Sequence, residues 1–323
     1  MSEISNINVG GTSYSLKDNT ARENIVLETQ NTKDWAKGTF SNPNLLINGD
    51  FQVWQRGTNI SLSNNGYTAD RWHMWSSKST IFTKANEYGG IKFTGNGNNN
   101  FGYIFEKSTM TKENNVYSIS IKAKSSKPGS CTVTLRDVEN ASGGGTALWG
   151  ETININENYQ IFKCTSSAVS AENYLKFSMS LYGAFDEAEI EIAWIKIELG
   201  EVATPFVPKV YADELAACQR YYLSMPKFTE FRLTNLSDNT VDFSIPLPVA
   251  MRITPTLVGA DNIGMVIVSI PEHANQTGFT LSTTYSNADK GYCLFRGTKE
   301  NHGLSDALII VMSSSVFLDA EIK

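Results

Sequence analysis

Two pairs of carboxylates are the residues whose spacing could support acid–base chemistry. Glu189 and Glu191 lie close together, as do Glu198 and Glu201, and paired carboxylates hydrolyse glycosidic bonds in glycosidases. However, Glu189 and Glu191 share one face of a predicted strand and alternate with isoleucines, which is typical of a solvated sheet surface. The sequence contains no HExxH, GxSxG, P-loop or dinucleotide-binding glycine motif. We therefore predict that the chain is not an enzyme.

Three aromatic residues and one histidine are the candidates for ligand contact. Sugars present apolar CH faces bordered by hydroxyls, so a glycan site needs an exposed ring flanked by amide or carboxylate groups. Trp75 and His73 share the face of one strand that is opposite the face of Trp72, a predicted core residue. Tyr182 is in phase with polar positions of its own strand, and Trp149 follows a glycine-rich loop. The predicted glycan-contacting residues are therefore His73, Trp75, Trp149 and Tyr182, and the alternative for each is packing at a rim or an interface.

Cysteine and histidine usage indicates neither a metal centre nor a redox centre. The sequence has three histidines and four cysteines, and no cysteine pair has the close spacing of a zinc or redox motif. We expect reduced thiols, which are typical of a protein assembled in a cytoplasm. The cysteines are Cys131, Cys164, Cys218 and Cys293.

Charge and hydropathy argue against two classes of partner. The chain has 27 Lys plus Arg and 33 Asp plus Glu, which gives a formal net charge of -6. Because no basic run occurs, we expect no nucleic-acid partner and no anionic membrane surface. No segment approaches the roughly 18 consecutive apolar residues of a membrane span. The N-terminus has no basic region followed by an apolar run, so we expect no secretory signal.

The hydrophobic pattern predicts a mainly β protein in three parts. Between residues 42 and 208, many short segments alternate with period two and are separated by glycine- and asparagine-rich turns, which favours an antiparallel jelly-roll β-sandwich. Residues 1–41 are predicted to form a hairpin followed by a helix from Asn19 to about Thr32. Residues 209 to about 222 have helical spacing and are predicted as a connector helix. Alternation then returns, so residues 209–323 are predicted to contain this helix and a smaller C-terminal β-sandwich.

Several segments resemble a known pattern. Residues 44–57 with 67–72 resemble the opening of the carbohydrate-binding-like jelly roll of phage and prophage tail proteins, and residues 194–206 resemble its closing strand. Residues 214–222 with 246–256 are similar to the distal junction of tail fibres, and residues 9–22 to a phage attachment segment.

In related jelly rolls, residues near the Asn48–Asp50 turn and an acidic pair on the last strand hold a structural calcium. Here Gln52 replaces a common Glu, and Ala193-Trp194 replace the acidic pair. Calcium is therefore disfavoured, and we expect no cofactor.

The resemblance implies a receptor-binding protein of a phage tail fibre or baseplate tip. Such a protein is expected to be a homotrimer in the virion, assembled in the bacterial cytoplasm. Residues 1–41 would attach to other tail or baseplate proteins, and a β domain would bind a host cell-surface polysaccharide. The alternatives are a structural assembly protein without receptor binding and, less favoured, a tailspike-type depolymerase.

Overall fold

The computed structural model describes most of the central region of the chain and parts of both ends. The described residues are 6–15, 41–76, 78–95, 98–225, 230–231, 233–237, 239–258, 265–269, 275–276, 280–287, 292–298, 300, 307–312 and 316–322.

The N-terminal hairpin is present as predicted. Strands β1 (Asn6–Val9) and β2 (Thr12–Ser15) pair antiparallel. Gly10 and Gly11 form the turn with φ angles of 59° and 84°, a region that glycine occupies without steric cost. The predicted helix from Asn19 to about Thr32 lies outside the described residues.

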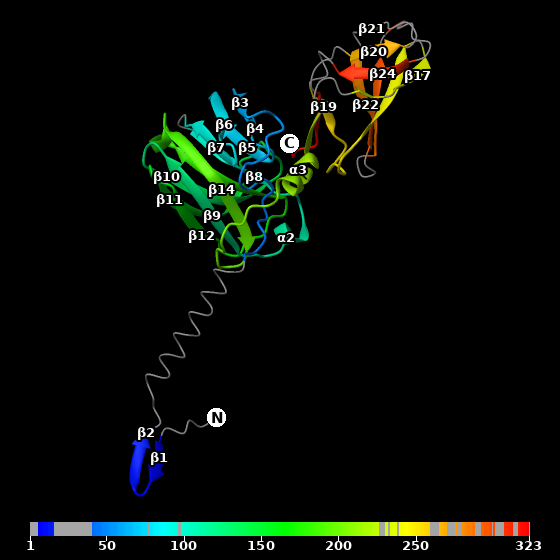
Figure 1. Ribbon diagram of the computed structural model, residues 1–323. Coiled ribbons are helices and arrows are strands. Elements are labelled where there is room, and N and C mark those ends of the chain that lie inside the picture. The colour runs from blue at the N-terminus through cyan, green and yellow to red at the C-terminus, as the bar shows by residue number, and fades with distance from the viewer. Residues whose placement is uncertain are drawn as a thin grey trace.

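Two six-stranded antiparallel sheets form the central β-sandwich (Figure 1). The first sheet contains β4 (Gly66–Tyr67), β5 (Trp72–Ser76), β8 (Asn98–Ile104), β10 (Gly129–Val138), β11 (Thr146–Ile155) and β13 (Tyr174–Tyr182). Its strand order is β11-β10-β13-β8-β5-β4. The second sheet contains β3 (Asn59–Leu62), β6 (Thr80–Asn86), β7 (Gly89–Thr94), β9 (Tyr117–Ser125), β12 (Gln160–Thr165) and β14 (Glu189–Leu199). Its order is β12-β9-β14-β7-β6-β3. The predicted jelly-roll β-sandwich is confirmed.

The sandwich core follows directly from period-two alternation. Every second residue of β13 is an apolar side chain with no solvent exposure: Leu175, Phe177, Met179 and Leu181. Trp72, a predicted core residue, is also fully buried, and its ring stacks on Phe101 with centroids 5.2 Å apart. Burying each such side chain stabilises the fold by about 1.5–3 kcal/mol. Two short helical segments, α2 (Thr109–Lys112) and η1 (Gly183–Phe185), connect strands.

The run Leu45-Leu46-Ile47 is apolar and predicts a buried strand, but the segment after Pro43 forms turns, so that prediction is wrong. Asn48 and Phe51 adopt φ angles of 58° and 56°, which end any regular strand. The Asn48 side chain holds this turn, because its Nδ2 donates to the Val53 carbonyl at 2.9 Å and its Oδ1 accepts from the Val53 N–H at 2.9 Å. The bulky residues of the segment reach the core from a turn instead of from a strand.

The predicted connector helix is present as α3 (Tyr211–Gln219). The apolar residues at helical spacing are Leu215, Cys218 and Tyr222. Cys218 and Tyr222 are buried, whereas Leu215 is only partly buried and Glu214 is the second buried residue of the helix. The Glu214 carboxylate accepts the backbone N–H of Asn48, which attaches the helix to the 48–51 turn. A hydrogen-bonded carboxylate therefore takes the inward position that the pattern assigned to leucine.

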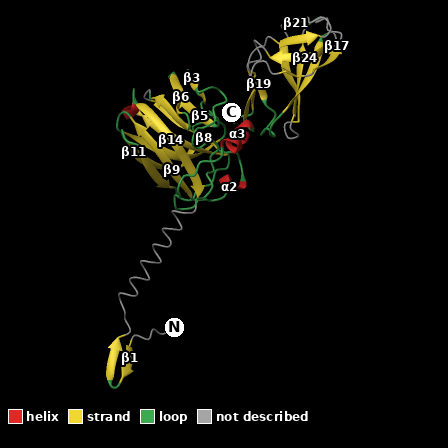
Figure 2. Ribbon diagram, in the orientation of Figure 1, coloured by secondary structure: helices red, strands yellow, loops and turns green. Residues whose placement is uncertain are grey.

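β structure returns after α3, as predicted (Figure 2). One sheet contains β15 (Tyr222–Met225), β19 (Thr256–Val258) and β25 (Val316–Asp319), in the order β15-β25-β19. A second contains β16 (Glu230–Phe231), β20 (Met265–Ser269), β21 (Asn275–Gln276) and β24 (Ala307–Met312), in the order β16-β24-β20-β21. A third contains β17 (Leu233–Ser237), β18 (Thr240–Pro246), β22 (Thr280–Asn287) and β23 (Tyr292–Thr298), in the order β17-β18-β23-β22. No helix among the described residues is long and apolar enough to span a membrane.

A buried ion pair joins the C-terminal segment to the sandwich. The Arg71 guanidinium pairs with the Glu321 carboxylate, and both side chains are almost completely buried. Arg71 also donates to the Ile104 carbonyl at 2.7 Å and lies 3.6 Å from the centre of the Tyr221 ring. Arg56 adds a second cation 3.3 Å from Glu321. Such a network fixes how the C-terminal segment packs on the sandwich, because loss of one charge would leave its partner buried and uncompensated.

Candidate functional site

Three of the four predicted ligand residues share one surface, the outer face of the first sheet. We define this face as the outward side chains of β5, β8 and β13, which are His73, Trp75, Asn100, Lys176, Ser178, Ser180 and Tyr182. The register aligns Trp75 with Asn100 and Asn100 with Ser180, while Tyr182 follows at the end of β13. These side chains alternate with the buried residues of the core. The outer face is therefore one surface, with His73, Trp75 and Tyr182 on it.

The half of this face around Trp75 is covered. Residues 139–145, the loop between β10 and β11, fold back over it, and Arg136 holds the loop by donating to the carbonyls of Gly144 and Gly145 at 2.5 and 2.8 Å. The Trp75 indole N–H donates to the Ala141 carbonyl, and the Lys176 ammonium lies 3.5 Å from the centre of a Trp75 ring. Trp75 is only 8% exposed as a result.

His73 lies next to Trp75 and is also largely buried. Its ring is 4.4 Å from the Trp75 ring and 4.8 Å from the Tyr67 ring, between centroids. Burial first, and then the positive charges of Lys176 and Arg56, lower the pKa of His73 to about 3. The imidazole is therefore neutral near neutral pH.

A cleft of about 250 Å³ borders this histidine, with Tyr67, Ala141 and Ile322 among its other lining residues. The Tyr67 hydroxyl donates to the Ile322 carbonyl at 2.8 Å. The side chain of Ile322 is 1% exposed and packs with Trp75, Ile104 and Ala141 in a small hydrophobic cluster. The C-terminal end of the chain thus forms part of the cover over this half of the outer face.

The half around Tyr182 is open. Tyr182 is 49% exposed, and the Asn100 amide donates to its hydroxyl at 2.8 Å. The Ser180 hydroxyl donates to the carbonyl oxygen of the same amide at 2.6 Å. A flat exposed ring bordered by a fixed amide and a hydroxyl matches the pattern of apolar faces and hydroxyls on a sugar. Tyr182, Asn100 and Ser180 therefore form what we call the Tyr182 platform.

The fourth predicted residue, Trp149, lies elsewhere. It pairs in register with the core residue Leu135 across β10 and β11 and packs, half-buried, against the sandwich core. The structure therefore does not bring Trp149 together with Tyr182 on the outer face.

Asn100 is a residue of the platform that the sequence analysis missed. The glycine- and asparagine-rich residues 95–100 predict a turn, but β8 begins at Asn98. The usable signal is that Asn100 takes the phase opposite to the apolar residues Phe101 and Tyr103.

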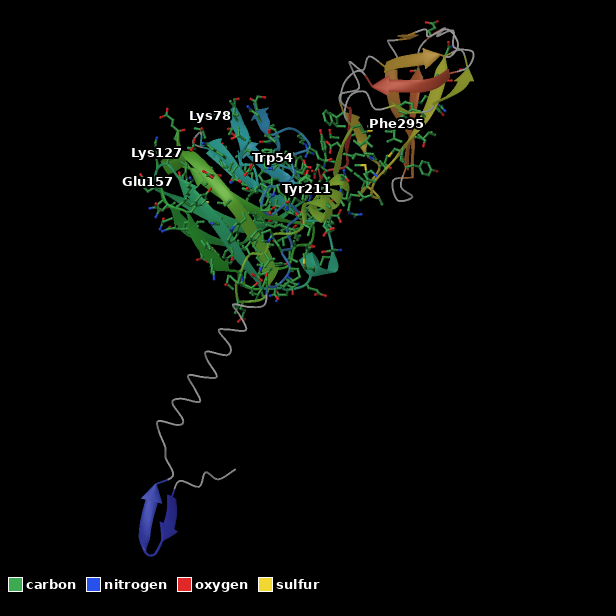
Figure 3. All side chains as sticks on the ribbon, in the orientation of Figure 1. Trp54, Lys78, Lys127, Glu157, Tyr211 and Phe295 are labelled. Carbon is green, nitrogen blue, oxygen red and sulfur yellow. The ribbon has the colours of Figure 1, made fainter. Side chains whose placement is uncertain are left out.

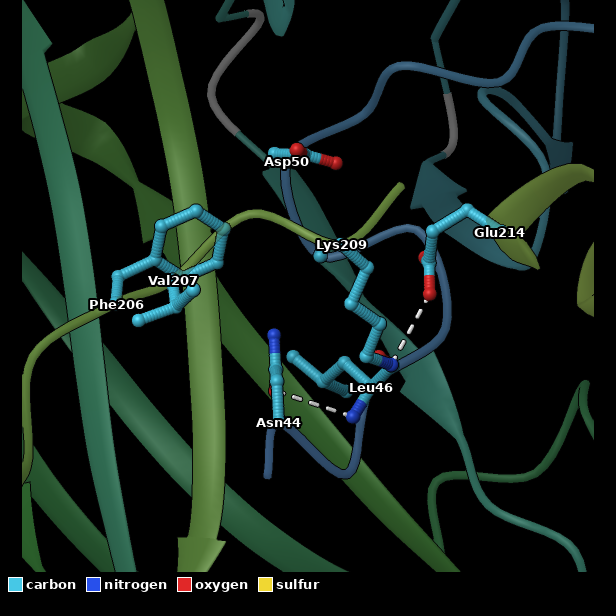
Figure 4. Close-up of a pocket in the computed structure, with 8 residues that line it drawn as sticks. Asn44, Leu46, Asp50, Phe206, Val207, Lys209 and Glu214 are labelled. Carbon is cyan, nitrogen blue, oxygen red and sulfur yellow. Dashed lines mark hydrogen bonds and ion pairs between the residues drawn. The ribbon is translucent and has the colours of Figure 1, made fainter. Parts of the chain in front are cut away.

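The Lys209 ammonium lies beside the 48–51 turn (Figure 4). Lys209 donates to the Leu46 carbonyl at 3.1 Å and pairs with the Glu214 carboxylate at 3.0 Å. The adjoining cavity, which Asp50 also lines, has a volume of about 10 Å³, room for about one water molecule. No group of three or more His, Cys, Asp or Glu side chains in the described part of the chain could hold a metal ion. The expected absence of a calcium site stays a prediction.

Neither carboxylate pair forms an acid–base pair in the structure. Glu189 pairs with Lys92 at 2.7 Å, and Glu191 pairs with Lys124 at 3.0 Å, on the outward side of the second sheet. Glu198 is fully buried and pairs with Lys196 at 3.2 Å. None of the four cysteines forms a disulfide, and all four are buried.

Comparisons with known proteins locate similar structures for about half of the chain. No protein-family model and no curated protein matches the sequence. Similar solved structures include a CBM4 protein with 17% identity, which covers 48% of this chain and 100% of its own, with a TM-score of 0.34. The CBM22-1 xylan-binding domain from Paenibacillus barcinonensis is 14% identical over 51% of this chain and 100% of its own, with a TM-score of 0.34. A family 11 carbohydrate-binding module from Clostridium thermocellum is 12% identical over 45% of this chain and 97% of its own, with a TM-score of 0.30.

Proposed function

We propose that the chain is a non-enzymatic, glycan-binding subunit of a phage tail fibre or baseplate tip, which attaches the virion to a polysaccharide on the host surface. The observation that carries the glycan-binding part is the Tyr182 platform. Its ring is exposed and already held by Asn100, so little side-chain entropy is lost when a sugar stacks on it. Weak binding at one such platform gains strength when several copies act together.

The phage assignment is supported by the four sequence segments that resemble tail proteins. In this proposal the chain is a homotrimer in the virion, residues 1–41 attach to other tail proteins, residues 42–208 form the sandwich, and residues 209–323 form the distal part. A purely structural assembly protein is the second candidate, and the covered, tightly packed junction around Arg71 favours it. A depolymerase is the least favoured candidate, because both carboxylates of the Glu189/Glu191 pair are neutralised by surface lysines.

The test is retention of the intact chain on whole bacterial cells from a panel of strains with different surface polysaccharides. We expect at least one strain to bind the chain, and Tyr182→Ala to weaken that binding by about tenfold, the typical loss of a central aromatic contact. Tyr159→Ala is the matched control, since Tyr159 is an exposed tyrosine outside the outer face. Absence of binding to every strain, together with tight binding to other virion proteins, would establish the assembly role instead.

The oligomeric state is tested separately by light scattering. The expected mass is three times the chain mass of 35.6 kDa. A stable monomer at micromolar concentration overturns the homotrimer and, with it, the gain in strength from several copies.

A further inference from the structure

A second cleft, with two exposed tyrosines, lies where α3 leaves the sandwich. Its volume is about 480 Å³, within the range of roughly 300–1,000 Å³ that is usual for ligand sites. Tyr88 and Tyr211 line it and are 82% and 51% exposed, so both rings are accessible to a ligand. Figure 3 labels Trp54 and Tyr211 in this part of the molecule, and both residues line the cleft.

The Tyr88 wall is fixed to the 48–51 turn. Tyr88 lies at the tip of the β6–β7 hairpin, where the Asn86 side chain accepts the Tyr88 backbone N–H at 2.9 Å. The next residues, Gly89 and Gly90, pack against the turn, and the Gly90 N–H donates to the Asp50 carbonyl at 2.7 Å. Gly89 has a φ angle of 151°, and a Cβ there would collide with the same carbonyl. This contact requires glycine and holds the hairpin tip in place.

The Tyr211 wall is fixed to the same turn. Tyr211 is the first residue of α3, and Glu214, one turn later, accepts the backbone N–H of Asn48. Lys209, just before the helix, donates to the Leu46 carbonyl at 3.1 Å. Two rings from distant parts of the sequence are thus attached through their backbones to one turn. The backbones that carry the two rings are therefore held in one arrangement before a ligand binds.

The floor and rim of the cleft supply polar groups of both kinds. The Gln52 amide nitrogen donates to the Lys209 carbonyl at 3.2 Å, and its amide oxygen accepts no hydrogen bond from another residue in the described ranges. Lys84 and Glu87 both line the cleft and carry opposite charges, and the Lys84 ammonium donates to the Glu87 carbonyl at 3.0 Å. The lining therefore combines aromatic rings, an amide, an ammonium and a carboxylate with no net charge.

We infer that this cleft is a second glycan-binding site, which takes a short neutral oligosaccharide with its sugar rings packed against Tyr88 and Tyr211. The inference rests on the proposed glycan-binding function and names a second place where it is carried out. Because the rim carries no net charge, it gives no long-range attraction to a strongly acidic or basic ligand. Because Tyr211 begins the helix that leads to the C-terminal strands, a bound sugar contacts both the sandwich and the segment that connects it to the distal part.

Tyrosine nitration of the intact chain locates the site without any substitution. The probes are β-1,4-linked tetrasaccharides of glucose, xylose and galactose at millimolar concentration, and peptide mass spectrometry reads the nitration rate of each tyrosine. We expect a bound probe to slow nitration of Tyr88 and Tyr211 by about tenfold when about 90% of the sites are occupied. Tyr159 is the internal control and keeps its rate.

The possible outcomes separate this inference from the proposed function. Protection of Tyr88 and Tyr211, with or without protection of Tyr182, supports the cleft as a glycan-binding site. Protection of Tyr182 alone overturns the cleft and leaves the proposed function standing. No protection of any tyrosine by any probe overturns both.

Two substitutions then test the role of the rings. Tyr88→Ala and Tyr211→Ala are each expected to weaken binding of the protecting probe by about tenfold, whereas Tyr88→Phe and Tyr211→Phe, which retain the ring, bind within about threefold of the original chain. Circular dichroism is expected to be unchanged, because both side chains are largely exposed. Tyr159→Ala is the matched control. Unchanged affinity of both alanine variants overturns the inference.

Discussion

The two halves of the outer face differ in whether their aromatic side chains are displayed. Trp75 and Tyr182 both occupy outward positions, on strands that flank β8, yet Trp75 is 8% exposed and Tyr182 is 49% exposed. The difference comes from residues 139–145 and from Ile322, which cover Trp75 and leave Tyr182 open. Strand phase therefore decides the side on which a residue lies, and segments distant in sequence decide whether a ligand can reach it.

The covered half has the composition of a small core and the open half that of a binding surface. Around Trp75 the contacts are apolar packing, an indole hydrogen bond and a nearby ammonium. Around Tyr182 the partners are an amide and hydroxyls that remain within reach of a ligand. We therefore expect substitutions in the covered half to change stability and those in the open half to change binding.

The largest expected effect on stability follows removal of the Arg71 charge, which pairs with Glu321 in the C-terminal segment. Arg71→Ala leaves the Glu321 carboxylate buried with only Arg56, so we expect the free energy of unfolding to fall by about 3–5 kcal/mol. Urea denaturation measures it. The control is Glu189→Gln, which breaks the exposed pair with Lys92 and should cost less than about 1 kcal/mol. Equal losses for the two variants would show that the junction is not a buried network.

The next largest expected effect on stability follows truncation of Ile322, which covers Trp75. Ile322→Ala removes a side chain that is 1% exposed and packs on Trp75, so we expect a loss of about 2–5 kcal/mol in urea denaturation. The matched control is Val207→Ala at a position that is 58% exposed, with an expected change within about 0.5 kcal/mol. If Ile322→Ala were as stable as the original chain, the C-terminal end would not cover Trp75 in solution.

Much of the fold was predictable because its signals are local. Period-two alternation indicated β9, β10 and β13, and helical spacing indicated α3. The turn after Pro43 was not predictable in this way. A run of Leu-Leu-Ile fits a strand, but Asn48 and Phe51 have positive φ angles, and the Asn48 side chain donates to the carbonyls of Val53 and Asp70 further along the chain. Tertiary contacts overrode the local pattern there.

The candidate site was predictable only in part, for the same reason. The outward phase of His73, Trp75 and Tyr182 follows from the sequence, and the structure agrees. The cover over Trp75 comes from a loop and from the C-terminal end, which no periodicity connects to β5. The attachment of Tyr88 and Tyr211 to one turn likewise depends on contacts between distant segments.

The pH dependence of stability gives an intermediate effect that is specific to the covered half. The pKa of His73 is about 3 in the folded chain and about 6.5 when exposed, so the unfolded state takes up the proton first as pH falls. Stability from the neutral imidazole is present above pH 6.5 and is lost towards pH 3, by about 1.4 kcal/mol per pH unit. Burial raises the pKa of Asp70 to about 6, so this carboxyl adds stability as pH falls, opposite to His73. The pH dependence of wild-type stability therefore does not report on His73 alone.

His73→Gln isolates it, because glutamine is polar but does not titrate and Asp70 is common to both proteins. Between about pH 7 and pH 5, we expect wild type to lose about 2 kcal/mol relative to His73→Gln in urea denaturation. A constant difference between the two proteins across this range would mean that His73 is solvated and that the cover over it is open.

The smallest expected effect on stability is in the open half, and it completes the contrast. Tyr182 is half exposed and contacts the sheet through its hydroxyl, so Tyr182→Ala should change the free energy of unfolding by less than about 1 kcal/mol. The same substitution is expected to reduce cell binding by about tenfold. Urea denaturation and cell retention, measured on one preparation, compare the two quantities directly. A large loss of stability with unchanged retention would place Tyr182 with Trp75 as a structural residue, and display on the outer face would then not indicate a ligand site.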